Sequence, residues 1–310
     1  MSSSPTRILA TLLLACTLVS CTTAPPPDPA AIDALFKEAR AHDAAARHDD
    51  AIGVYRRLLV QDADSFDGHY WMARALDLAG RYDEAREHFE RAIELSSDSN
   101  REQTLRMTAI AWTFVSNADQ AGRYYRQVFD ARATAGNHPG AAEVANELAR
   151  MYLELGDIGQ AEEWYRTGYD VAAKEQGRSA AQADLAELRW AHAQGRIAAR
   201  RGRPDEAQRH IAAVRTLVEK GTNSGQEPQL AYLRGYVAYH LGDAAGAVEA
   251  LQRADQEDPF ILLLLAQAHE RQAHAAMARE YYEKVMASTS HAVTAAIARP
   301  IARDRLAATR

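Results

Sequence analysis

The amino-acid sequence predicts an all-α protein, built as a solenoid of repeated helix pairs. After residue 31 it shows little strand signal, and runs rich in Ala, Leu, Arg and Glu alternate with short breaks of Gly, Asp and Asn. One spacing recurs within these runs: a Gly, an Ala five residues later, and an aromatic or large apolar residue four residues after the Ala. A recurring spacing of this kind is typical of a repeat array.

The composition of the 310-residue chain is ordinary for a globular protein. Hydrophobic residues make up 47% of it and charged residues 25%, which argues against wholesale disorder and against a polytopic membrane protein. The formal net charge is −6, so the chain offers no basic surface for non-specific binding to nucleic acid. We therefore expect no nucleic-acid partner.

Residues 1–20 have the features of an export signal. Ile8–Val19 is an apolar run that is too short to span a bilayer and suits the core of a signal peptide. The run leads into Leu-Val-Ser-Cys at residues 18–21, which resembles the lipobox of bacterial lipoproteins. The resemblance implies cleavage before Cys21, lipidation of its sulfur with acyl chains such as palmitate, and sorting to the outer membrane because Thr22 follows. An ordinary secretory signal with an incidental cysteine is the alternative.

Residues 21–31 are predicted to be a tether. Thr22–Ala30 contains four prolines, which favour an extended polyproline conformation and disfavour helix. At ~3.1 Å per residue this segment reaches roughly 25–30 Å, enough to hold the folded body just off a lipid surface. A proline-rich docking motif is the alternative interpretation.

Residues 32–287 carry the repeats. The spacing occurs in four places: Gly80/Ala85/Phe89, Gly156/Ala161/Tyr165, Gly202/Ala207/Ile211 and Gly242/Ala247/Leu251. It resembles the tetratricopeptide repeat (TPR), a 34-residue helix–turn–helix unit. A Gly ends the first helix because it adopts the left-handed conformation without steric cost, and the small residues let the paired helices approach closely. The resemblance implies a right-handed superhelical solenoid of about six to seven repeats.

Seven units are expected along the chain, with the third and seventh irregular. Their ranges are Ile32–Ser65, Phe66–Ser99, Glu102–Ala135, Ala142–Glu175, Leu188–Gly221, Pro228–Ile261 and Pro259–Ser288. Residues 288–310 are expected to form a C-terminal capping helix with Pro300 inside it, because the apolar face of the last repeat needs a cover.

The sequence shows no constellation that would support catalysis. Phosphate-binding, dinucleotide-binding and nucleophile-elbow motifs are absent, and both cysteines, Cys16 and Cys21, lie in the first 21 residues. His269 and His274 are five residues apart, which would place their imidazoles about 140° apart on one helix and disfavours zinc. Acidic pairs such as Glu162 and Glu163 fit a solvated helix face. We therefore expect no enzyme activity, no cofactor and no metal.

The resemblance implies a concave groove, lined by the first helix of each pair, as the binding face. Transferring the repeat register to this chain gives eight candidate partner-binding residues: Arg40, Tyr70, Arg74, Asn146, Arg150, Arg196, Tyr232 and Tyr236. Guanidinium groups accompanied by tyrosines suit an extended segment that bears carboxylates. The alternative, left open at this point, is that these arginines form a solvated face.

These features lead to two functional hypotheses. The first is a protein-interaction scaffold or adaptor of a bacterial cell envelope, anchored through Cys21 and facing the periplasm, which holds a segment of an envelope protein in its groove. The second is an enzyme or a small-ligand-binding protein with a site inside the superhelix, which the absence of motifs disfavours.

Overall fold

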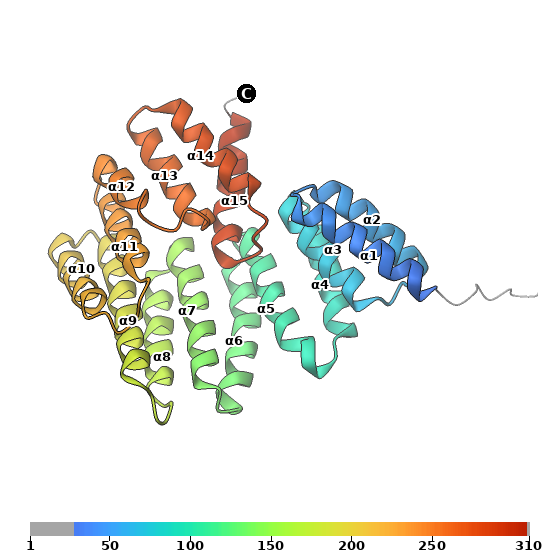
Figure 1. The fold of residues 1–310 in the computed structure, drawn as a ribbon, viewed down its shortest axis with the longest axis horizontal. Helices are drawn as coiled ribbons and strands as arrows, with labels where there is room; N and C mark the ends of the chain where they lie inside the picture. Colours follow the sequence, from blue (N-terminus) through green and yellow to red (C-terminus); the bar gives the residue numbers. More distant parts are fainter. Residues whose placement is uncertain (1–27, 309–310) are drawn as a thin grey trace, which may run out of the picture.

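The computed structural model describes residues 28–308. Fifteen helices and no strands form this part of the chain (Figure 1). The predicted signal peptide, Cys21 and most of the proline-rich tether lie outside the described residues. The first helix, α1, begins at Pro29, earlier than the predicted end of the tether. Pro29 is accommodated in the first turn, and the Asp28 side chain accepts a hydrogen bond from the Ala30 amide at 3.0 Å, so this Pro-rich end starts the helix.

The first fourteen helices form seven antiparallel pairs, in agreement with the predicted repeats. The pairs are α1 (Pro29–Ala44) with α2 (His48–Gln61), α3 (Phe66–Ala79) with α4 (Tyr82–Leu95), α5 (Asp98–Phe114) with α6 (Ala118–Thr134), α7 (His138–Leu155) with α8 (Ile158–Ala172), α9 (Ala180–Arg200) with α10 (Pro204–Glu219), α11 (Glu227–His240) with α12 (Ala244–Leu251), and α13 (Pro259–Arg271) with α14 (Ala275–Ala287).

A residue in the left-handed conformation separates the two helices of each pair. Gly80 (φ 87°) and Gly156 (φ 102°) end α3 and α7 in this way, as their place in the repeat predicts. The first, third and seventh pairs lack the glycine, and Ala46 (φ 57°), Ser116 (φ 55°) and Ala273 (φ 59°) adopt the same conformation there. The turn is therefore preserved without glycine, at the steric cost that a side chain brings to this conformation.

Packing within and between the pairs follows the small–aromatic pattern of the sequence. Ala85 and Phe89 on α4 are fully buried, and so are Ala121 and Tyr125 in the irregular third pair. Each small residue admits a neighbouring helix and each ring fills the space between two pairs. The apolar residues of α13 are buried in the same way. None of the helices within residues 28–308 is both long enough and apolar enough to cross a membrane.

The last helix, α15 (Val293–Ala308), does more than the predicted cap. It covers α13 and α14 as expected, and it also packs against α5 and α7, so that the superhelix turns back on itself (Figure 1). Three side chains join this segment to the second pair. His291 bonds Asp77 at 2.8 Å, Arg299 donates to the Leu78 carbonyl at 2.6 Å, and Arg303 donates to the Tyr82 hydroxyl at 2.8 Å.

Candidate functional site

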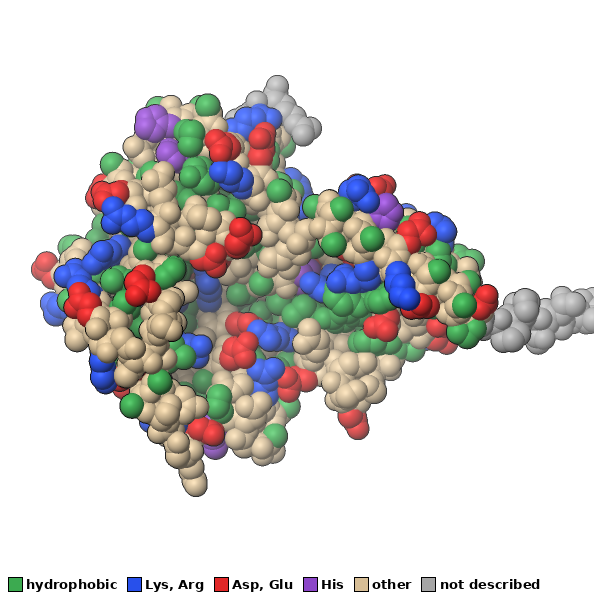
Figure 2. All heavy atoms as spheres, viewed as in Figure 1, with side chains coloured by type: hydrophobic (Ala, Val, Ile, Leu, Met, Phe, Trp, Pro, Cys, Tyr) green, Lys and Arg blue, Asp and Glu red, His purple; other side chains and the backbone are tan. Residues whose placement is uncertain are grey.

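The inner face of the solenoid contains a cavity of about 530 Å³ between α7, α9, α11 and the segment that leads into α15. Figure 2 shows a hollow at the centre of the molecule with charged side chains around it. Four of the eight predicted groove residues line this cavity: Asn146, Arg150, Arg196 and Tyr232. The repeat register therefore brings these residues together, since each lies on the first helix of its pair.

The wall of this cavity is a hydrogen-bonded arginine–tyrosine network. Arg196 donates to the Tyr165 hydroxyl at 2.7 Å, and Arg150 donates to the Tyr232 hydroxyl at 3.2 Å. Arg196 is only 6% exposed, so it is neither a solvated side chain nor a freely extended groove residue. Arg196 thus joins the fifth pair to the fourth, and Arg150 joins the fourth pair to the sixth.

A buried carboxylate balances part of this positive charge. Glu154 lies behind the cavity, accepting hydrogen bonds from Arg200 and from the Tyr236 hydroxyl, both at 3.2 Å. Burial raises the pKa of Glu154, and the nearby Arg196, Arg150 and Arg200 oppose that shift. Arg150 also forms an ion pair with Asp258 at 3.7 Å, and Glu143 and Glu147 line the cavity beside these arginines, so its wall carries charges of both signs.

Two predicted groove residues are unavailable to a partner. Tyr236 is fully buried, because its hydroxyl is bonded to Glu154 behind the cavity wall. Tyr70 is 5% exposed, accepts a hydrogen bond from Gln103 at 3.1 Å and packs edge-on against Phe89. The register places both on the inner helices, but neighbouring pairs cover them.

Arg40 and Arg74 lie in a different place from the other groove arginines. They line a second cavity of about 290 Å³ between α1, α3 and Thr289 of the segment that precedes α15. The main cavity borders Ala292–Thr294 of that same segment. The returning C-terminal segment thus separates the continuous groove that the sequence predicts into two sites.

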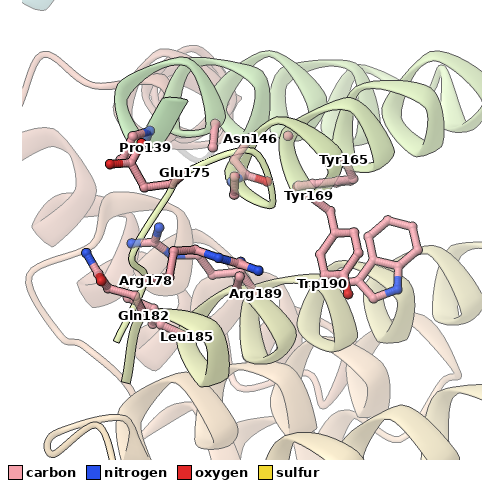
Figure 3. Close-up of a pocket in the computed structure, with 14 residues that line it drawn as sticks. Pro139, Asn146, Tyr165, Tyr169, Glu175, Arg178, Gln182, Leu185, Arg189 and Trp190 are labelled. Carbon is pink, nitrogen blue, oxygen red and sulfur yellow. The ribbon is translucent and has the colours of Figure 1, made fainter. Parts of the chain in front are cut away.

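The main cavity adjoins an apolar pocket that the repeat register does not predict (Figure 3). This pocket lies between α7, α8 and the first turns of α9, with a volume of about 240 Å³. Tyr169 and Trp190 lie together at one end of it, with ring centroids 5.4 Å apart, and Arg178 and Arg189 extend across it. Four residues line both spaces: Asn146, Tyr165, Leu185 and Arg189.

The unusual spacing of the repeats is the sequence signal for this pocket. Ala161 and Ala207 are 46 residues apart, whereas one TPR unit has 34. Part of the excess lies in α9, a helix of 21 residues that begins with a capping box at Ser179 and Gln182. Because α9 extends beyond the neighbouring helices, its first turns form a wall over α8. The spacing was visible in the sequence, but the pocket required the placement of this extra helix length.

The histidines at 269 and 274 require a correction to their predicted separation. The helix α13 ends at Arg271 and Ala273 has a φ of 59°, so the angle along a continuous helix does not apply. The two rings have centroids 5.7 Å apart. Throughout residues 28–308, however, no group of three or more His, Cys, Asp or Glu side chains is placed to hold a metal ion.

Comparisons of the sequence with protein families identify the repeats. A family profile described as tetratricopeptide repeat matches residues 36–100 and 192–260, and a second profile of the same description matches residues 113–174. Together the three ranges cover more than half of the chain. No curated protein matches the sequence.

Solved structures share the fold at low sequence identity. Aspartyl phosphate phosphatase F from Bacillus subtilis has a TM-score of 0.54 and 11% identity, covering 81% of this chain and 68% of that one. The TPR-like repeats of a putative kinesin light chain from Podosopora anserina have a TM-score of 0.52 and 20% identity. The match covers 64% of this chain and 99% of that one. A tetratricopeptide repeat protein from Parabacteroides merdae has a TM-score of 0.51 and 13% identity, and the match covers 90% of this chain and 99% of that one. At these identities the similarity concerns the fold alone.

Proposed function

Because the chain belongs to the tetratricopeptide-repeat family, we propose that it is an interaction scaffold that holds a segment of a protein partner in its inner cavity. Proteins of this fold are typically scaffolds without enzyme activity, and we propose no catalytic role. The observation that carries the proposal is the continuous space formed by the cavity of about 530 Å³ and the aromatic pocket beside it.

The chemistry of this space defines the partner segment. The pocket offers the rings of Tyr169 and Trp190 to an apolar side chain, and aromatic residues are favoured anchors in protein interfaces. The adjoining cavity is lined by Arg150, whose side chain is 19% exposed, and by the exposed Arg189, and both suit carboxylates. We therefore propose an extended segment with an apolar anchor followed by acidic residues.

We also propose that the scaffold is lipid-anchored at Cys21 and faces the periplasm from the outer membrane of a bacterial envelope. The support is the lipobox-like sequence that ends at Cys21 and the proline-rich segment that follows it. In the described part, α1 begins at the outer edge of the molecule, so a tether entering there would leave the inner cavity open (Figure 1).

Capture of a partner tests the proposed binding site. The native chain and a Leu185→Glu, Arg189→Glu double variant are used to capture proteins from detergent-solubilised envelopes. Both residues line the cavity and the pocket, and both lie outside the buried arginine–tyrosine network, so the fold is expected to persist. The matched control is Arg209→Glu, an exposed charge reversal on α10.

The expected result is one envelope protein captured by the native chain and by Arg209→Glu but lost with the double variant. Equal capture by all three would place binding on another surface and refute the cavity as the site. A separate experiment tests the anchor: metabolic labelling with a palmitate analogue is expected to label the native chain and not Cys21→Ser. A labelled Cys21→Ser chain, or an unlabelled native chain, would refute lipidation at Cys21.

A further inference from the structure

The second cavity, between α1, α3 and Thr289, has a floor of small and apolar side chains. Ala75 and Leu78 contribute to it, and Thr289 borders it from the returning C-terminal segment. Its volume of about 290 Å³ is at or below the lower end of the range for pockets that hold whole drug-sized ligands. A space of this size suits one small polar group.

Two guanidinium groups meet over one indole ring in this cavity. The Arg40 Cζ atom lies 3.4 Å from the centroid of the Trp71 ring, and the Arg74 Cζ atom lies 4.3 Å from it. The negative face of the ring attracts a cation, but it does not neutralise two. The arrangement concentrates positive charge at the cavity.

The positive charge of Arg74 has no counter-charge of its own. Within the described chain, Arg74 makes no hydrogen bond and no ion pair, and its Nε atom is buried without a partner. Burial lowers the pKa of Arg74 and the Arg40 charge adds to that shift, whereas Tyr70 and Asp43 oppose it. The side chain as a whole is only partly buried, so its charged group stays protonated and its open edge is accessible to a ligand that supplies the missing acceptor.

The nearest carboxylate is already occupied. Asp43 is buried and accepts a hydrogen bond from the Tyr55 hydroxyl at 2.8 Å. Its contact with Arg40 is longer, at 3.4 Å, and it forms no ion pair with Arg74. Two guanidinium groups therefore share one carboxylate, and the cavity keeps a net positive charge.

The edge of the cavity at Thr289 is fixed by contacts made far along the chain. Arg299 donates to the Ser288 carbonyl at 2.7 Å, and His291 is bonded to Asp77 at 2.8 Å. These bonds hold Thr289 over α3. The cavity is therefore complete only while the C-terminal segment rests on the second helix pair.

We propose that this cavity is an oxyanion-binding site in which Arg40 and Arg74 receive a carboxylate or phosphate group. Guanidinium groups bind both anions through paired hydrogen bonds. The acidic side chain of a partner is one source of such a group and free phosphate is the other. The assignment of the bound group to an acidic side chain of a partner rests on the proposed scaffold function, whereas the assignment of an anion-binding site does not.

Anion titrations of the full chain in detergent test this site. The probes are an acetylated peptide of alternating glutamate and alanine, the same peptide with glutamine in place of glutamate, and inorganic phosphate, each followed by calorimetry. The test variant is Arg74→Leu. The matched control is Arg56→Leu, which removes an exposed guanidinium on α2 that is paired with Glu84.

The expected result is binding of the glutamate peptide or of phosphate, no binding of the glutamine peptide, and a loss of about tenfold or more in affinity for Arg74→Leu. The melting temperature of unliganded Arg74→Leu is expected to stay unchanged or to rise by about 1–3 °C, because a partly buried charge without an ion pair is removed. Loss of binding with a retained fold then cannot be attributed to unfolding. Arg56→Leu should bind as the native chain does.

Each result has a defined meaning. Binding of the glutamate peptide assigns a peptide source, and binding of phosphate alone assigns a free anion. Binding of neither anion, unchanged affinity in Arg74→Leu, or a lower melting temperature in Arg74→Leu than in Arg56→Leu would overturn the proposal. The partner-capture experiment with Leu185 and Arg189 variants depends on the other cavity, so the two proposals can fail separately.

Discussion

Arg299 joins the last helix pair to the second, and its replacement is the strongest test of the closed arrangement. This side chain is 2% exposed and donates to the carbonyls of Met286 and Ser288 at 2.8 and 2.7 Å. It also donates to the Leu78 carbonyl at 2.6 Å. The last carbonyls of a helix have no partner within the helix, so Arg299 satisfies the C-terminal ends of α3 and α14 together.

We expect Arg299→Leu to lower the free energy of unfolding by about 2–4 kcal/mol. A buried carbonyl left without a donor costs about 1–3 kcal/mol, and the three short hydrogen bonds would be lost together. Removal of a buried charge offsets part of this loss, since burial lowers the pKa of Arg299 to about 10, which reflects the unfavourable desolvation of its charged form. The matched control is Arg279→Leu on α14, whose exposed i,i+4 pair with Glu283 contributes at most about 0.5 kcal/mol.

Urea denaturation followed by circular dichroism gives the change in stability, and hydrogen exchange shows where protection is lost. The expected pattern is loss of protection in both α15 and the end of α3, because the Leu78 bond couples them. A stability within about 0.5 kcal/mol of the native value would refute the energetic argument. A loss of protection confined to α14 and α15 would show that the link to α3 contributes nothing.

Three further predictions concern the turns, the histidines and the buried carboxylate. Gly80→Ala should destabilise more than Gly156→Ala in urea denaturation. Both variants lose about 1–2 kcal/mol to left-handed strain, but only a Cβ at position 80 would displace the Arg303 guanidinium from its hydrogen bond with the Tyr82 hydroxyl, and equal losses would contradict this. Burial lowers the pKa of His240 to about 3, so the folded protein keeps this side chain neutral. As the pH falls below 6.5, the unfolded chain binds a proton at His240 and the folded chain does not, so the free energy of unfolding decreases. Between pH 7 and 5 the stability of His240→Gln should therefore fall by about 1–2 kcal/mol less than that of the native chain, and equal slopes would refute it. Glu154→Gln should lower stability by about 2–4 kcal/mol in thermal or urea denaturation, because three guanidinium groups lose a buried counter-charge, and an unchanged midpoint would contradict the network.

The site was only partly predictable from the sequence. The register placed Asn146, Arg150, Arg196 and Tyr232 on inner helices, and they do line one cavity. It could not show that Tyr236 is buried, because the carboxylate that bonds its hydroxyl lies 82 residues earlier in the chain. Inner-helix position follows from a local period, whereas exposure depends on which neighbouring repeat covers the residue.

The sequence by itself determined the helix pairs and their order. Glycine at the turns, small residues at the close contacts and rings between the pairs act over short distances, so they can be interpreted within one repeat. Only the tertiary structure decided that the array closes. The contact between Asp77 and His291 joins residues 214 positions apart, and it depends on the summed curvature of all the intervening pairs. That curvature arises from many small packing angles, which no single repeat encodes, and it separates one expected groove into two cavities.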